Sequence, residues 1–433
     1  MDQTLFTDDF KETPYWWDAA PRPEPAEASL PAKVDVVVVG SGNVGLSAAL
    51  TLARGGRHVL VLEAEAAGYG ASTRNAGYVG RTLWSKFSSL QAQLGTDRAV
   101  ALCNEAVASH HYVVKLIEHE QIDCHFTYCG RFIAAETQSQ LKMLKDDLAA
   151  MVKQGVEIDG HMVAKSEMHR EIASDYYLGG MVLEGVGALH PGLYHQGLTD
   201  RVLNAGAVII DHTPVTAIER DSAGFKVTTP RGNISARDVV VGTNGYTGPP
   251  TPYMARRVIP TPAYMIVTEP LGLERMKALL PTGRTIIDSK VNIFWTRPTP
   301  DGERLIFGCR TGMRQDDLKI KAREMYGDML KVFPQLEGVK LSHCWTGNMG
   351  FTFDKLPHTG AHEGVEFTTG LCGVGIPMGT YLGHKTGLRV LGDAEGASAF
   401  DGRPFPTRPF YTGNPWFLPL VMGYYNIKDR LAR

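Results

Sequence analysis

The stretch that most constrains the fold is 34–63, which reads VDVVVVGSGNVGLSAALTLARGGRHVLVLE. The unbroken β-branched run at 36–39 predicts a strand buried on both faces. A G-x-G-x-x-G motif follows it, and the apolar residues of the next segment recur at helical intervals. A second apolar strand at 59–62 then delivers Glu63. This order of elements favours a dinucleotide site: a strand, a glycine turn, a helix and a second strand that ends in an acidic residue.

The glycines of this unit suit the binding of a pyrophosphate. Gly40 can take the tight turn, Gly42 lets a phosphate approach the backbone, and Gly45 lets helix and strand pack closely. The helix start offers free N–H groups and a positive dipole end. Glu63 can accept hydrogen bonds from ribose hydroxyls, and its charge disfavours the 2′-phosphate of an NADP-type ligand. The alternative is a βαβ unit whose glycines serve packing alone.

The composition argues against several classes of protein. A chain of 433 residues is long enough for two domains, and its net charge of −2 recommends neither nucleic acid nor an anionic membrane. The longest apolar runs are strand-sized, far below the roughly 20 residues of a spanning helix. The acidic N-terminus lacks the features of a signal peptide. We therefore expect a cytoplasmic protein with no transmembrane segment and no nucleic-acid partner.

The six cysteines do not suggest a metal site. None forms a C-x-x-C pair, and the cluster of His119, Cys124, His125 and Cys129 fits no common zinc spacing. We expect no bound metal, and we interpret the cysteines as reduced core thiols.

Elements of the dinucleotide-binding type recur at three separated places, with strand-rich segments between them. This order predicts an α/β (α+β) fold, in which a Rossmann-like cofactor domain is built from discontinuous segments and an antiparallel sheet forms a substrate domain. The predicted division is a leader arm at 1–33, the cofactor domain at 34–90, 190–250 and 340–400, the substrate domain at 91–189 and 251–339, and a C-terminal tail at 401–433.

Glycines, prolines and aromatic residues predict the structure of the leader, of the last long helix and of the C-terminal tail. The prolines of the leader predict irregular structure, anchored on the body by the aromatic residues at 15–17. The glycine-rich run at 370–379 predicts a loop that opens a last long helix at 380–391. Beyond 401, prolines and aromatic residues predict a tail that wraps over the surface.

Further motifs follow along nearly the whole chain. They are G-A-S-T-R-N-A-G at 70–77, A-L-H-P at 188–191, G-T-N-G-Y at 242–246, F-D-K-L-P-H-T-G at 353–360 and G-L-C-G-V-G at 370–375. With the first motif, and in this order, they resemble the D-amino-acid oxidase-like family of FAD enzymes, which includes glycine and sarcosine oxidases. The P-Y-W-W leader and the P-F-P-T-R-P-F-Y-T-G-N-P-W-F-L-P tail resemble its gamma-glutamylputrescine oxidase branch.

The resemblance implies FAD as the cofactor. It places the pyrophosphate on the first motif, the adenosine ribose on Glu63, the adenine against the backbone of Val215, and the flavin's pyrimidine end at the last glycine-rich motif. A positive helix end there would stabilise the anionic reduced flavin. The implied cofactor-binding residues are Gly40, Ser41, Gly42, Asn43, Val44, Gly45, Glu63, Ser72, Arg74, Asn75, Ala76, Gly77, Val215, Thr243, Asn244, Gly373, Gly375 and Ile376.

Three departures from the family pattern bear on the site. Asn348 and Met349 occupy the region where glycine oxidase-like members carry an arginine for the substrate carboxylate. Pro377 stands where sarcosine oxidase-like members carry a lysine. Cys344 is out of register with the cysteine that tethers flavin in sarcosine oxidases, so we expect noncovalent FAD.

Few residues stand out as candidates for contact with the substrate. Arg81 follows the second glycine-rich loop and is a candidate anion contact; a surface arginine is the alternative. Trp84, Tyr264, Trp295 and Trp345 can wall an apolar slot or belong to the core. The candidate catalytic residues are Arg81, Trp345 and Asn348.

The reaction implied is oxidation of the C–N bond of an amine or amino-acid derivative. Hydride passes to flavin N5, and the resulting imine hydrolyses to a carbonyl compound and an amine. The expected acceptor is O2, reduced to H2O2, with an electron carrier as the alternative. Two other functions remain open, an FAD-dependent dehydrogenase of a hydroxy acid and a non-catalytic FAD-binding subunit.

Overall fold

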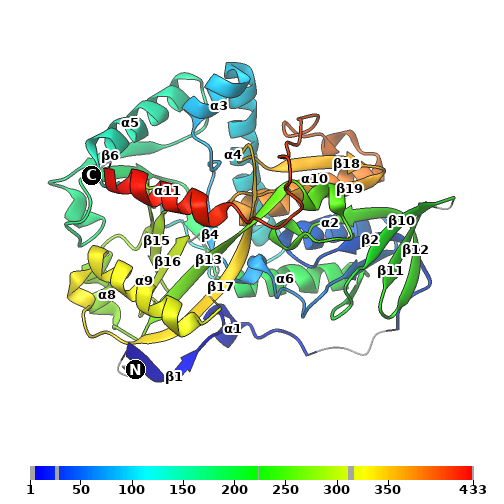
Figure 1. Ribbon diagram of the computed structural model, residues 1–433, viewed down its shortest axis with the longest axis horizontal. Helices are drawn as coiled ribbons and strands as arrows, with labels where there is room; N and C mark the ends of the chain where they lie inside the picture. Colours follow the sequence, from blue (N-terminus) through cyan, green and yellow to red (C-terminus); the bar gives the residue numbers. More distant parts are fainter. Residues whose placement is uncertain (1–4, 25–28, 223, 311–315, 432–433) are drawn as a thin grey trace.

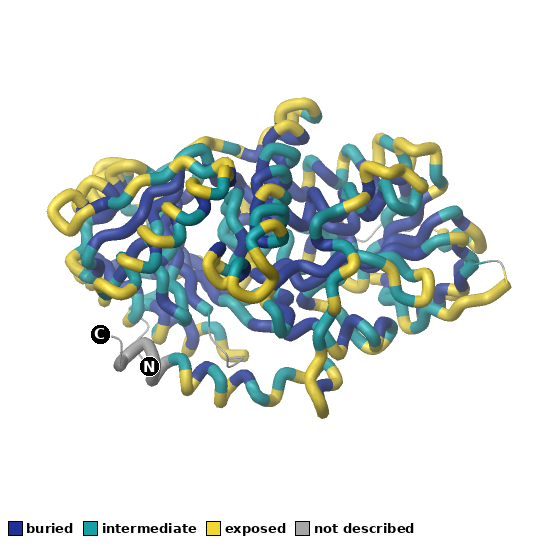
Figure 2. The backbone as a smooth tube through the Cα atoms, turned by 90° about the horizontal axis from the view of Figure 1, so that it is seen from above, coloured by how far each residue is buried: buried dark blue, intermediate teal, exposed yellow. Residues whose placement is uncertain are grey.

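The computed structural model describes residues 5–24, 29–222, 224–310 and 316–431, and two large sheets lie side by side along its long axis (Figure 1). Strands of both sheets are buried along the middle of the molecule, and exposed residues concentrate in the outer loops and turns (Figure 2). The described helices are α1 (Trp16–Ala19), α2 (Asn43–Arg54), α3 (Phe87–Leu94), α4 (Thr96–His119), α5 (Gln138–Lys153), α6 (Pro191–Asn204), α7 (Pro252–Ala255), α8 (Leu273–Leu279), α9 (Leu318–Val332), α10 (Gly375–Leu391) and α11 (Leu418–Leu431).

The eight-stranded sheet contains the parallel core predicted from the first motif. Its order is β10 (Ala217–Asp221), β11 (Gly224–Thr229), β12 (Gly232–Val241), β2 (Lys33–Val39), β3 (Val59–Leu62) and β9 (Val208–Ile210), with β19 (Val365–Thr369) on β12 and β18 (His358–His362) on β19. Strands β2, β3, β9 and β12 run parallel. Val36 and Val38 pack with α2 and α6, while Val37 packs on the opposite face, so the strand is buried on both faces as predicted.

The nine-stranded sheet is mostly antiparallel. Its order is β1 (Phe6–Lys11), β17 (Leu341–Thr352), β13 (Val258–Thr268), β16 (Leu305–Arg310), β15 (Phe294–Pro298), β14 (Thr285–Asp288), β5 (Arg131–Ala135), β7 (Gly179–Leu183) and β6 (Gly160–Ala164). Because side chains alternate along a strand, Tyr264 and Ile266 of β13 pack with α8 and α9 on one face, and Ala263 and Met265 face the other way. A Rossmann-like sheet from separated segments beside an antiparallel sheet confirms the predicted fold class.

Two predicted boundaries do not coincide with the edges of the sheets. Strand β17 pairs with β13, so the segment that begins at 340 first completes the nine-stranded sheet and only then returns to the other one at β18. Helix α4 lies in the predicted substrate segment but packs on α10, through Leu102, Ala106 and Leu382. Strand β17 and helix α4 therefore pack with the other unit from the one to which the predicted division assigns them.

The leader is more ordered than its prolines predict. Strand β1 and helix α1 both precede Pro21, and β1 pairs in parallel with β17. Trp16 is fully buried, and its indole N–H donates to the Asn75 carbonyl at 2.9 Å. The aromatic residues thus fix the leader against the second glycine-rich loop.

The last long helix begins five residues earlier than predicted, and the tail holds a helix that was not predicted. Helix α10 starts at Gly375 because its glycines serve packing and not loop formation. A Cβ added to Gly383 would lie 2.4 Å from the carbonyl oxygen of Val44 in α2. Within the tail Phe405 stacks on His358, and α11 follows.

No helix within the described ranges combines the length and the hydropathy needed to cross a bilayer. The cytoplasmic location stays a prediction.

Candidate active site

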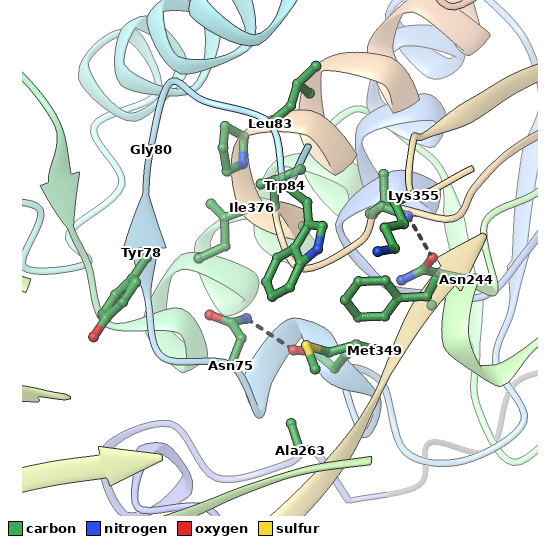
Figure 3. Close-up of a pocket in the computed structure, with 18 of the residues that line it drawn as sticks. Asn75, Tyr78, Gly80, Leu83, Trp84, Asn244, Ala263, Met349, Lys355 and Ile376 are labelled. Atoms are coloured by element: carbon green, nitrogen blue, oxygen red, sulfur yellow. Dashed lines mark hydrogen bonds between the residues drawn. The ribbon is translucent and has the colours of Figure 1, made fainter. Parts of the chain in front are cut away.

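A cavity of about 1170 Å³ lies between the two sheets. Its wall combines the loops that follow β2, β3 and β12 with one face of the nine-stranded sheet and the start of α10 (Figure 3). Ligands of open parallel sheets bind at this carboxyl edge. The volume exceeds the roughly 300–1,000 Å³ of a drug-sized pocket, so there is room for a dinucleotide and a second small molecule.

The first glycine-rich loop has the geometry that its spacing predicts. Gly40 has a φ of +96°, which favours glycine, and a Cβ added to Gly45 would lie 1.9 Å from the Gly40 carbonyl oxygen. Gly42 and Asn43 line the cavity at the start of α2, the end of a helix that favours an anion. The Asn43 N–H donates to the Ser72 hydroxyl at 2.9 Å, which joins the two glycine-rich loops.

Glu63 is held at the cavity wall by neighbouring backbone and side-chain donors. Ser41 donates to one carboxylate oxygen through both its N–H and its hydroxyl, each at 2.8 Å, and the Ala64 N–H donates to the other. Ser41 is itself fixed by His195 of α6, whose Nε2 donates to the Ser41 carbonyl at 2.7 Å. Burial lowers the pKa of His195 to about 4, so the imidazole is neutral near pH 7.

Hydrogen bonds within the second glycine-rich loop stabilise its conformation. The Asn75 amide donates to the carbonyls of Ala71 and Ser72, and its oxygen accepts from the Gly77 N–H at 2.7 Å. Arg74 donates to the carbonyls of Tyr69 and Thr346, so its guanidinium links this loop to β17.

Asn244 joins three segments beneath the cavity. It has a φ of +42°, and its side-chain oxygen accepts from the N–H groups of Gly370 and Leu371 (Figure 3). A Cβ added to Gly350 would lie 2.3 Å from this oxygen. Asn244 therefore sets the position of the loop that leads into α10, whose first residues, Gly375 among them, line the cavity.

The floor of the cavity is an apolar sheet face. It is formed by Ala263 and Met265 of β13, Trp295 of β15, Ile287 of β14 and Ile133 of β5. Trp84 and Ile376 lie above it, and Figure 3 shows the indole of Trp84 beside Ile376 and facing the region of Met349. Such a surface excludes water and suits the uncharged form of a ligand.

A buried charged cluster at one edge of this floor was not predicted. The Lys290 ammonium lies 2.9 Å from Glu136 and 3.0 Å from Asp288, and both Lys290 and Asp288 line the cavity. Burial raises the pKa of Asp288 to about 7. The signal was available in the sequence, since Asp288 and Lys290, separated by one serine, follow the short strand at 285–287.

The structure brings most of the predicted residues to the cavity. Those on the cavity are Gly40, Gly42, Asn43, Val44, Glu63, Ser72, Arg74, Asn75, Ala76, Val215, Thr243, Asn244, Gly373, Gly375, Ile376, Arg81 and Asn348. Ser41, Gly45 and Gly77 lie behind the wall and shape its loops. Trp345 is 1% exposed and donates to the Arg74 carbonyl, and it does not line the cavity. Tyr264 also lies in the core, whereas Trp84 and Trp295 line the cavity.

Two arginines that line the cavity, Arg81 and Arg131, differ in their hydrogen-bond and ion-pair partners. Arg81 donates to the Gly185 carbonyl at 2.5 Å and pairs with Glu157 at 3.5 Å. Arg131 also lines the cavity, and it was not among the predicted residues. Its signal is an arginine on the same strand face as Ile133, within the apolar run R-F-I-A-A.

Comparisons with known proteins agree with this geometry. A family model described as DAO, FAD dependent oxidoreductase, matches residues 35–387. The chain is 31% identical over 403 residues to the gamma-glutamylputrescine oxidoreductase of Escherichia coli (strain K12), across 92% of this chain and 93% of that protein. The crystal structure of glycine oxidase from Geobacillus kaustophilus covers 88% of this chain and 99% of its own, with a TM-score of 0.72 at 22% identity. L-proline dehydrogenase from P. horikoshii covers 90% and 99%, with a TM-score of 0.69 at 18% identity.

Proposed function

Because this chain belongs to the DAO family of FAD-dependent oxidoreductases, we propose that it oxidises a C–N bond of an amine or amino-acid derivative. One observation carries the proposal. A single cavity joins the two glycine-rich loops to an apolar chamber over the nine-stranded sheet, so a cofactor and an amine can meet without intervening water.

The residues present fit FAD. Gly42 and Asn43, at the start of α2, would hold the pyrophosphate, and a Cβ at Gly42 would intrude on that space, 3.0 Å from the Ser72 hydroxyl. Glu63 would hold the adenosine ribose and Val215 the adenine. Gly373 and the N-terminus of α10 would face the pyrimidine end of the flavin, where a positive helix end favours negative charge.

Noncovalent attachment is part of the proposal. Cys344 is fully buried in the core, where burial raises the pKa of its thiol, and Cys372 donates to the Gly370 carbonyl. Neither thiol lines the cavity.

FAD supplies the two-electron oxidant when it is bound. The chain's own side chains hold the substrate: Met265, Trp295 and Trp84 offer an apolar slot that favours the neutral amine over the ammonium form. The substrate loses two electrons and two protons and becomes an imine, which water hydrolyses to a carbonyl compound and an amine. We propose O2 as the acceptor of the electrons, giving H2O2.

The substrate class follows from the relatives and from the site. The relative named gamma-glutamylputrescine oxidoreductase acts on a conjugated diamine by its name, and we propose an amine of that kind. Asn348 and Met349 line the cavity in the region where glycine oxidase-like members carry an arginine for the substrate carboxylate. An acid group of the substrate would therefore bind at another place in the cavity.

The test starts from the absorbance spectrum of the purified protein loaded with FAD. Anaerobic addition of a panel of N-acylated diamines, monoamines and N-alkyl amino acids is expected to bleach the flavin bands with at least one of them, and air should then yield peroxide. Bleaching by hydroxy acids alone would establish the dehydrogenase alternative. A spectrum that no amine and no hydroxy acid changes would support a non-catalytic subunit and overturn the proposal.

A further inference from the structure

Arg131 is a buried cation without a counter-charge on the wall of the cavity. It is 8% exposed and lines the cavity at the first position of β5. Its Nη2 is buried without a hydrogen-bond partner, and its Nε has only a long contact of 3.5 Å to the Thr285 hydroxyl. Within the residues that the structure describes, no aspartate or glutamate forms an ion pair with it.

The surroundings of Arg131 are apolar on the sheet and open toward the cavity. Its guanidinium lies over the ring of Tyr78, 5.0 Å from the ring centroid. A Cβ added to Gly80 would lie 3.0 Å from its Nη1, so the glycine leaves the room that this guanidinium occupies. The Tyr78 hydroxyl donates to the carbonyls of Ile286 and Thr296. Tyr78 therefore contacts Arg131 through its ring face and does not supply an anion.

Two other cations that line the cavity have carboxylate partners. Lys290 pairs with Glu136 and Asp288, and Arg81 on the neighbouring segment pairs with Glu157. A guanidinium stays charged at any physiological pH, and a buried charge without a partner is costly. A ligand with a negative charge would stabilise the buried guanidinium and offset this free-energy cost.

We propose that Arg131 is the anchor for a carboxylate of the substrate, so that the enzyme takes amines that carry an acid group. The guanidinium fork can donate charge-assisted hydrogen bonds to a carboxylate. The inference rests on the proposed amine oxidation and adds the class of amine to it. The anchor would take the place of an arginine near Asn348.

The first experiment measures binding without turnover. Butyrate and its uncharged analogue butyramide are titrated into the FAD-loaded wild type and into Arg131→Met, with the dissociation constants read by calorimetry. Butyrate is expected to bind the wild type and to lose about 10- to 100-fold in Arg131→Met, as for a lost charge-assisted hydrogen-bond pair. Butyramide should bind both proteins equally. Arg131→Lys, which keeps the charge and loses the fork, should fall between them.

The second experiment measures turnover with matched amines. The KM of a carboxylate-bearing amine should rise about 10- to 100-fold in Arg131→Met, while the KM of its amide counterpart stays unchanged. A purely structural arginine would shift both amines alike. Equal shifts for both amines, or butyrate that binds wild type and Arg131→Met equally or binds neither, would overturn the anchor.

The two proposals fail separately. Turnover of amines with no dependence on Arg131 refutes the anchor and leaves the oxidation standing. Binding of butyrate that depends on Arg131, with no amine oxidised, refutes the oxidation and leaves an anion site standing.

Discussion

Single residues decide whether the cavity wall can accept a cofactor. Gly42 and Gly45 belong to one motif, yet they have different structural roles. Gly45 packs against the Gly40 carbonyl, where a Cβ would lie at 1.9 Å, while Gly42 faces the cavity with only the Ser72 hydroxyl nearby. Gly45 thus lets the helix pack close to the strand, and Gly42 leaves room for the ligand.

This difference predicts separate outcomes for two substitutions. Gly42→Ala should keep the free energy of unfolding of the FAD-free protein within about 1 kcal/mol and should weaken FAD binding about tenfold or more, because the new methyl group occupies ligand space. Gly45→Ala should lower the free energy of unfolding itself by about 1–3 kcal/mol or more. Fluorescence titration with FAD and denaturant unfolding measure the two effects. Wild-type FAD affinity in Gly42→Ala would contradict the assignment of this glycine.

At the scale of elements, close contact between α2 and α10 positions the start of α10 on the cavity. Gly383 makes this contact, since its backbone lies against Val44 of α2, and Gly379 and Gly387 lie one turn before and after it. The helix pair is held by backbone proximity, which glycine allows and larger residues prevent.

Gly383→Ala should therefore destabilise the protein by about 1–3 kcal/mol through overpacking. The matched control is Gly327→Ala in α9, where a Cβ meets nothing within 4 Å. Alanine there should stabilise the helix by up to about 1 kcal/mol. Urea unfolding of both variants is the measurement. Equal effects of the two substitutions would show that α2 and α10 are not in tight contact.

At the scale of the whole molecule, burial of histidines ties stability to pH. Burial lowers the pKa of His110, His190, His195 and His384 to about 4 in each case. In the unfolded chain the pKa is about 6.5, so the unfolded state takes up protons first as the pH falls. The stabilisation is present in full above about pH 6.5 and is lost progressively toward about pH 4.

His195 should account for roughly 3 kcal/mol of this loss, since one pKa unit corresponds to about 1.4 kcal/mol. His195→Gln removes the titrating group, so the free energy of unfolding should fall less between about pH 7 and pH 4 than in the wild type. His119→Gln, at a side chain that is 83% exposed, is the control and should follow the wild type. An unchanged pH profile in His195→Gln would refute the linkage.

The sequence determined the local chemistry of this protein. The run at 34–63 was enough to predict β2, α2 and β3, because a buried parallel strand, a glycine turn and a helix leave local signatures in spacing and residue type. Fold class and cofactor followed from motifs of this kind.

The tertiary structure alone decided which residues meet. Trp345 and Arg131 are both residues of the nine-stranded sheet, but the second glycine-rich loop covers Trp345 and leaves Arg131 on the cavity. The assignment of β17 and α4 also depended on packing between distant segments. Burial and the presence of a counter-charge are properties of these long-range contacts, and spacing along the chain does not encode them.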